Sequence, residues 1–158
     1  ILTGFKNMLI QKQIKSTIDT DYIFIEGKSK IDCKYFIDKI NNNSQKSTTH
    51  VVGDMTNFKF FVNDLNFENF IVPVLSVLDN YTFLRKYNLM EAWGLKEGYG
   101  QRTTKHDHLP NYLSGVLYLN NHKQKLLFDE IKQEVKPEEG KFVLFSSFLK
   151  HKAERNLS

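Results

Sequence analysis

Residues 102–119, RTTKHDHLPNYLSGVLYL, contain two histidines one residue apart, a break at a proline and a short apolar segment. Successive side chains of an extended strand point to opposite faces, so His106 and His108 project the same way if this stretch is extended. Two imidazoles at one strand end can meet a single metal ion. The apolar segment after Pro110 predicts a second strand.

Short strand-like segments separated by turn residues continue from about residue 89 to the end of the chain. Breakers lie at Gly98, Gly100, Pro110, Asn120–Asn121 and Pro137–Gly140. This spacing is typical of an antiparallel sandwich or barrel. The predicted strand segments are MEAWGLKE, RTTKHDH, LSGVLYLN, KLLFDEI, EVKP and KFVLFSS.

Two stretches upstream show helical periodicity. Residues 31–43, IDCKYFIDKINNN, predict a helix that ends in the run of asparagines. Residues 66–88 predict a second helix, bent or delayed by Pro73 and ending or turning near residue 83. Residues 41–50 read as a polar loop, and residues 51–62 are expected to be partly extended. The chain therefore reads as one α+β domain, mainly β, with residues 1–90 supporting a β core over residues 91–158.

Composition narrows the class of protein. A formal charge of +4 with dispersed lysines gives only weak support for nucleic-acid binding. The single cysteine, Cys33, excludes an internal disulfide and any cysteine-cluster metal site, which suits an intracellular, cytoplasmic location. No stretch has the roughly 20 apolar residues that a membrane-spanning helix needs, so no membrane partner is expected.

A third ligand for a metal at the paired histidines must come from elsewhere in the chain. His151 is the natural candidate because it follows the strand-like segment KFVLFSS and the short stretch FLK. Two ligands from one strand end and one from a later strand form a facial site with open positions. His50 and His122 lie in polar surroundings and are predicted to be surface residues.

The order of these features resembles that of the double-stranded β-helix oxygenases that depend on iron(II) and 2-oxoglutarate. It is similar to members common in phages and marine bacteria, and more distantly to prolyl hydroxylases. The resemblance covers residues 91–156: AWG and a glycine before the histidines, HDH, LSGVLYLN, KPEEGKFVLFSSFLKH and Asn156. It implies a double-stranded β-helix (jelly-roll) core with N-terminal supporting helices, and a core truncated at Ser158. It also implies an intracellular protein of phage origin.

Carried over by position, the resemblance makes His106 the first metal histidine and His151 the distal one. His108 falls where the wider superfamily has the carboxylate of a His-x-Asp motif, which is a departure, although His-x-His is common in the closer group. Asp107 points away from the ion on a regular strand. The third ligand is thus His108, Asp107 after local twisting, or water, and His108 is favoured.

The same resemblance assigns residues to the co-substrate. Tyr118 matches the tyrosine with which prolyl hydroxylases contact the far carboxylate of 2-oxoglutarate, although a buried structural tyrosine fits the position equally well. The family's anchoring arginine is expected beyond Ser158. Within the chain, Arg155 lies by strand parity on the same face as His151 but near the metal, which makes it a poor replacement for that anchor, and Arg102 is another candidate.

The resemblance implies that the protein is a dioxygenase that uses Fe(II), 2-oxoglutarate and O2. Such an enzyme hydroxylates a substrate, which the sequence does not identify. Oligomeric state is not indicated either. Apolar walls that exclude water from the site are expected from Trp93, Leu95, Leu117, Phe142, Leu144 and Phe145.

Two alternatives stay open. A cupin-like metal protein shares the barrel, and Gly100 followed by His-x-His fits the first cupin motif. The expected glutamate is replaced by Asn111 and Tyr112, and ten residues separate Gly140 from His151, more than the second cupin motif allows. The other alternative is a non-catalytic jelly-roll binding or structural domain.

Overall fold

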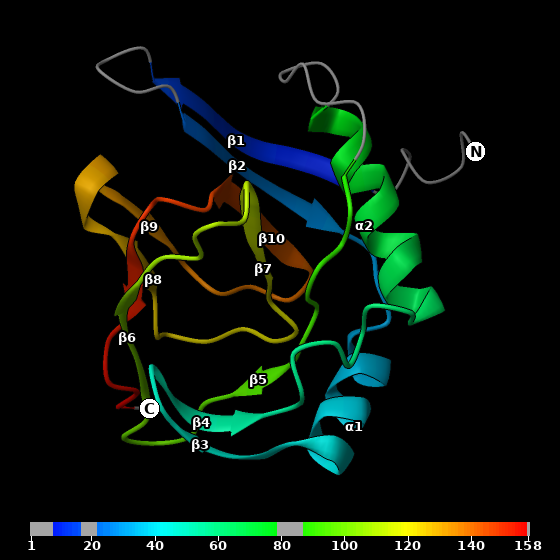
Figure 1. Ribbon diagram of the computed structural model, residues 1–158, viewed down its shortest axis with the longest axis vertical. Coiled ribbons are helices and arrows are strands. Elements are labelled where there is room, and N and C mark those ends of the chain that lie inside the picture. The colour runs from blue at the N-terminus through cyan, green and yellow to red at the C-terminus, as the bar shows by residue number, and fades with distance from the viewer. Residues whose placement is uncertain (1–7, 17–21, 79–86, 158) are drawn as a thin grey trace.

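The computed structural model describes residues 8–16, 22–78 and 87–157. Within these ranges the chain forms two antiparallel β-sheets and two α-helices (Figure 1). The expected α+β composition, mainly β, is confirmed. No helix among the described residues is both long and apolar enough to cross a lipid bilayer.

The first sheet has the strand order β1-β2-β10-β7. Its strands are β1 (Met8–Ser16), β2 (Tyr22–Ser29), β10 (Lys141–Ser146) and β7 (Leu113–Leu117). β10 is central, because it pairs antiparallel with β2 on one side and with β7 on the other, and all six of its residues are buried. β7 is an edge strand of this sheet.

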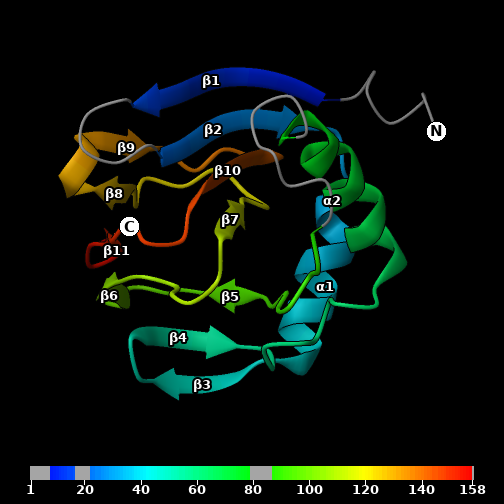
Figure 2. The ribbon, with the colours of Figure 1, turned by 45° about the horizontal axis from the view of Figure 1, so that its top comes forward.

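The second sheet has the order β3-β4-β6-β11-β8-β9, with β5 also paired to β4. Its strands are β3 (Gln45–Thr48), β4 (Val51–Met55), β5 (Leu95–Lys96), β6 (Arg102–His106), β8 (Leu126–Phe128), β9 (Gln133–Val135) and β11 (His151–Ala153). In Figure 2 its strands β3, β4 and β6 lie below the first sheet. A short 3-10 helix, η2 (Asp129–Ile131), joins β8 to β9. The strands predicted after residue 89 are thus present.

The first half of the chain contributes more strands than its sequence pattern predicts. β2 lies between β1 and β10, and β3 and β4 extend the second sheet next to β6. The β core therefore draws on residues before 91 as well as after. The predicted polar loop over 41–50 includes β3, and the predicted extended stretch over 51–62 includes β4.

The main core lies between the two sheets. Phe24, Val143 and Phe145 from the first sheet meet Phe128 and Val135 from the second, and all five side chains are almost fully buried. The ring of Phe128 stands edge-on to Phe24 at 5.1 Å and to Phe145 at 4.9 Å, an arrangement that aromatic pairs favour.

The opposite face of the first sheet is covered by α2 (Leu65–Leu78), and this corrects part of the expected apolar wall. Phe142 and Leu144 pack with Phe70, Val74 and Leu78 of α2, and Leu117 contacts the same cluster. Alternate residues of β10 face opposite ways, so Phe145 lines the interior while Phe142 and Leu144 do not. Phe142, Leu144 and Leu117 therefore pack against α2 and do not form the wall of a functional site.

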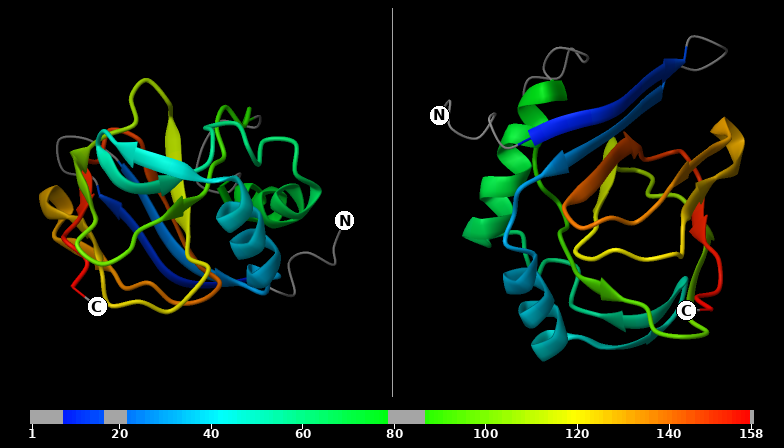
Figure 3. Two further views of the ribbon diagram at one scale, coloured as in Figure 1. Left: turned by 90° about the horizontal axis from the view of Figure 1, so that it is seen from below. Right: turned by 180° about the vertical axis from the view of Figure 1, so that it is seen from behind.

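Both helices lie on one side of the molecule, away from β6, β8, β9 and β11 (Figures 1 and 3). α1 (Cys33–Asn43) confirms the first predicted helix, and Asp32 caps it by accepting a hydrogen bond from the Tyr35 backbone N–H at 3.0 Å. α2 continues through Pro73, and residues 79–86 of the second predicted helix lie outside the described residues. Asp64 caps α2 and also accepts a hydrogen bond from the Tyr35 hydroxyl at 2.6 Å.

α1 packs closely against the chain at Gly94, and a substitution there tests this packing. A Cβ added at Gly94 would overlap Cγ1 of the α1 residue Ile40. Gly94→Ala is expected to lower the free energy of unfolding by about 1–3 kcal/mol, because α1 would have to shift. Gly98→Ala is the control, since its Cβ would meet nothing closer than 3.5 Å. Urea denaturation measures both, and equal effects would contradict this packing.

Candidate metal centre

The pairing of β11 with β6 places His151 directly opposite His106. These residues are 45 positions apart in the chain, yet their ring centroids lie 4.5 Å apart. Each sits at the end of its strand, His106 as the last residue of β6 and His151 as the first of β11. The sheet itself therefore brings two of the three predicted ligands together.

His108 joins this pair. Its ring centroid is 4.9 Å from that of His106 and 5.0 Å from that of His151. One ligand atom from each of the three histidines lies within 4.8 Å of the others. Nitrogens bound to one ion at about 2.1 Å are about 3.0–3.4 Å apart, so side-chain rotations that move each ring by about 1 Å would close the cluster on a metal. The three histidines form a group that can hold a metal ion.

Backbone hydrogen bonds orient two of the rings. Nδ1 of His106 lies 2.7 Å from the Thr104 carbonyl oxygen, and Nδ1 of His151 lies 3.1 Å from the Leu149 carbonyl oxygen. A carbonyl oxygen only accepts, so each Nδ1 carries the hydrogen and the lone pair is on Nε2. This is how metal-binding histidines are held in most known sites.

Ser147 positions His108 from the neighbouring turn. The His108 backbone N–H donates to the Ser147 carbonyl at 2.9 Å, and the Ser147 N–H donates to the Tyr112 carbonyl at 3.0 Å. The fully buried Ser147 hydroxyl also bonds to that of Ser114 at 2.7 Å. The loop after β6 is thereby tied to the turn between β10 and β11, which leads into His151.

Asp107 has a different role. Its carboxylate accepts a hydrogen bond from the Leu109 backbone N–H at 3.2 Å, which stabilises the turn after β6. Among the described residues, the cluster with metal-ligand spacing contains His108 and not Asp107. Of the two side chains that the sequence leaves as alternatives, His108 is therefore the one beside His106 and His151.

Burial keeps two of the imidazoles neutral. His151 is 3% exposed and packs against the rings of Phe145 and Phe128, with centroids at 4.8 and 5.4 Å. Desolvation lowers the pKa of His151 to about 4, and His106 and His108 add to this while the bond to Leu149 opposes it. Desolvation and then His106 lower the pKa of His108. Neutral imidazole is the form that binds metal.

A fourth histidine lies beside the cluster and was missed as a site residue. The ring of His50 is stacked on that of His106 at 6.2 Å between centroids. Its carbonyl accepts hydrogen bonds from the Thr104 backbone N–H and hydroxyl, at 2.8 and 3.0 Å. His50 is exposed, as predicted, but the pairing of β4 with β6 sets it near the candidate ligand His106. The position of His50 beside His106 follows from that strand pairing, which the sequence pattern does not reveal.

Tyr118 packs against the core between the sheets, but its charged neighbours are acidic. Burial raises the pKa of its hydroxyl, and the carboxylates of Glu26 and Glu97 raise it further. Glu26 is 8% exposed and faces the same side of β2 as Phe24. An anion at the Tyr118 hydroxyl would meet two carboxylates, so these surroundings do not fit the far carboxylate of 2-oxoglutarate.

The predicted arginines lie at the surface. Arg155, two residues beyond the end of β11, is exposed and forms no ion pair with any residue the structure describes. Arg102, at the start of β6, is exposed as well. Co-substrate binding by Arg155 stays a prediction.

No protein-family model, no curated protein and no solved structure matches the chain. The candidate site therefore rests on its own geometry, in which the ring nitrogens of His106, His108 and His151 converge as ligands that suit a transition metal.

The lowered pKa of His151 predicts how stability depends on pH in metal-free protein. In the unfolded chain this imidazole takes up a proton near pH 6.5, whereas in the folded chain it does so near pH 4. The free energy of unfolding should therefore fall by up to about 3 kcal/mol as the pH drops from 6.5 to 4, at about 1.4 kcal/mol per pKa unit. Denaturation with a chelator present measures this.

The matched variant for this test is His151→Gln, which removes the titrating group and keeps a polar side chain of similar reach. Its stability should fall less steeply over the same pH range. An identical slope in the two proteins would show that other groups cause the loss.

Proposed function

We propose that the protein is a dioxygenase that depends on Fe(II) and 2-oxoglutarate and hydroxylates a substrate still to be identified, on a double-stranded β-helix fold. The observation that carries this proposal is the convergence of His106, His108 and His151. Three imidazoles on one side of an ion leave its remaining positions for other ligands. Two antiparallel sheets enclosing an aromatic core agree with the proposed fold.

The chain supplies the surroundings that metal-centred oxidation needs. Bound Fe(II) with O2 would supply the oxidising chemistry. Phe128 and Phe145 close the inner side of His151, whereas His106 and His108 are only half-buried. The ion would therefore be reached from the side of the loop after β6. The carbonyls of Thr104 and Leu149 would keep two ligand rings in place while other ligands exchange.

The proposed identity of the co-substrate is supported only by the order of the sequence motifs. The proposal of 2-oxoglutarate comes from the HDH, LSGVLYLN and VLFSSFLKH pattern. The acidic neighbours of Tyr118 weigh against a role for that residue in binding it. A second candidate function follows from the same observation: a cupin-like metal protein, which needs the triad and no dicarboxylate.

Removing one ligand tests the metal centre. His151→Ala should weaken Fe(II) or Co(II) binding by at least about 100-fold, because one of three nitrogen ligands is lost. Lys152→Ala is the control: Lys152 is the next residue on β11 and pairs with Asp129 at 3.4 Å. Titration calorimetry under anaerobic conditions measures both. Equal affinities for the two variants would contradict the proposed centre.

The co-substrate is tested with the same proteins. Adding 2-oxoglutarate to the anaerobic Fe(II) protein should produce a weak visible charge-transfer band that His151→Ala abolishes and Lys152→Ala keeps. Metal binding without such a band would favour the cupin-like function, and no metal binding would favour a non-catalytic domain.

Tyr118→Phe separates the role of the hydroxyl from that of the ring. Because Glu26 and Glu97 both raise the pKa of the Tyr118 hydroxyl and would repel a bound carboxylate there, removal of the hydroxyl should change the affinity for 2-oxoglutarate by less than about threefold. Titration of the charge-transfer band gives this affinity. A tenfold or greater loss would show that Tyr118 does bind the co-substrate.

A further inference from the structure

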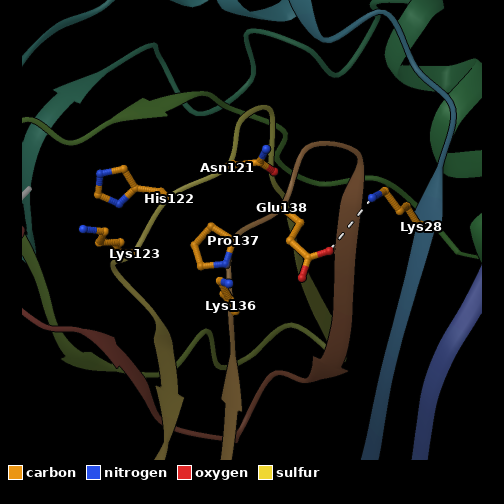
Figure 4. Close-up of a pocket in the computed structure, with 7 residues that line it drawn as sticks. All are labelled: Lys28, Asn121, His122, Lys123, Lys136, Pro137 and Glu138. Atoms are coloured by element: carbon orange, nitrogen blue, oxygen red, sulfur yellow. Dashed lines mark ion pairs between the residues drawn. The ribbon is translucent and has the colours of Figure 1, made fainter.

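A surface cavity that is open to solvent, with a volume of about 580 Å³, lies at the opposite end of the sheets from the histidines. Three segments line it: the end of β2, the connection from β7 to β8 and the connection from β9 to β10 (Figure 4). The lining residues are Lys28, Asn121, His122, Lys123, Lys136, Pro137 and Glu138.

The topology separates this cavity from the metal centre. β10 begins at the cavity end, directly after the loop that carries Glu138, and ends in the turn that leads to His151. β7 runs the other way, from the histidine end towards Asn121. The length of β10, six residues, is about 17 Å at about 3.3 Å per residue. A ligand in the cavity is therefore not a ligand of the metal.

Hydrogen bonds hold the two loops of the cavity together. The His122 backbone N–H donates to the Pro137 carbonyl at 3.3 Å, and the Glu139 N–H donates to Oδ1 of Asn121 at 2.9 Å. Gly140, with φ of 76°, turns the chain into β10, and its N–H donates to the Tyr118 carbonyl. The walls are thus built in the folded protein and do not depend on a ligand to form.

The lining is strongly positive. Lys28, Lys123 and Lys136 line the cavity together with one carboxylate, Glu138. That carboxylate is already shared, because it lies 3.9 Å from the Lys28 ammonium and 3.4 Å from that of Lys141 (Figure 4 shows the first pair). Lys123 and Lys136 pair with no acidic side chain among the described residues. Their charges are therefore uncompensated at the rim of a preformed cavity.

We propose that this cavity binds a small ligand that carries phosphate groups. Lysine ammonium groups attract phosphate as point charges. The volume falls within the 300–1,000 Å³ range, roughly, of small-molecule sites. With Oδ1 of Asn121 held by Glu139, the amide nitrogen of Asn121 adds hydrogen-bond donors at the same place. This site is independent of the proposed oxygenase function.

Pyrophosphate is the probe for this site. Calorimetric titration at low salt, with the full chain, should show binding that Lys123→Gln/Lys136→Gln weakens by at least about tenfold. The matched control is Lys46→Gln/Lys59→Gln, which removes the same charge from two exposed lysines that also pair with no described acidic side chain. This control should bind within about twofold of the wild type. Backbone NMR shifts on titration should be largest at Asn121, His122 and Glu138.

Three other outcomes of these titrations would contradict the proposed phosphate site. No binding of pyrophosphate at millimolar concentration, or equal losses in the two double variants, would reduce the cavity to general surface charge. Binding of a short duplex DNA with shifts at the same amides, in the absence of pyrophosphate binding, would make it part of a nucleic-acid surface. Loss of His151 leaves these readouts in place, so failure of the metal centre is seen separately.

Discussion

The antiparallel pairing of β11 with β6 is the constraint on which the candidate metal centre depends. It sets His151 opposite His106 and leaves the third histidine to the loop that follows β6. Neither strand is long, and β11 has only three residues. Their register is maintained by the neighbours on either side, β4 beside β6 and β8 beside β11, and by the aromatic core against which His151 is buried.

The grouping of His106, His108 and His151 could be predicted from the sequence because two local patterns indicate it. The alternation of side chains along a strand puts His106 and His108 on one side, and the apolar run before His151 indicates a second strand that ends in a histidine. His50 could not be found in this way. Its place beside His106 depends on β4 lying next to β6, and no feature within residues 45–55 indicates which strand is their neighbour.

The residues that line the space between the sheets were also hard to predict, because this too depends on which elements lie next to each other. Phe142, Leu144 and Phe145 all belong to one apolar run, yet strand alternation cannot let all three face the same cavity. Which parity faces inward is decided by α2, whose apolar side covers Phe142 and Leu144. β2 was missed as a strand because YIFIEGKS mixes a continuous apolar run with a buried glutamate, so it shows no clear alternation. Glu26 also raises the pKa of Tyr118, the residue to which the resemblance to oxygenases assigns the binding of an anion.

The edge position of β7 has a consequence for the behaviour of the protein in concentrated solution. An edge strand presents backbone N–H and C=O groups that can pair with another chain, and charged side chains usually discourage this. The other strands at sheet edges, β1, β3, β5 and β9, each contain a charged residue, whereas the β7 sequence LSGVL contains none. Of the described sheet edges, β7 is therefore the one at which strand-to-strand aggregation between copies would begin.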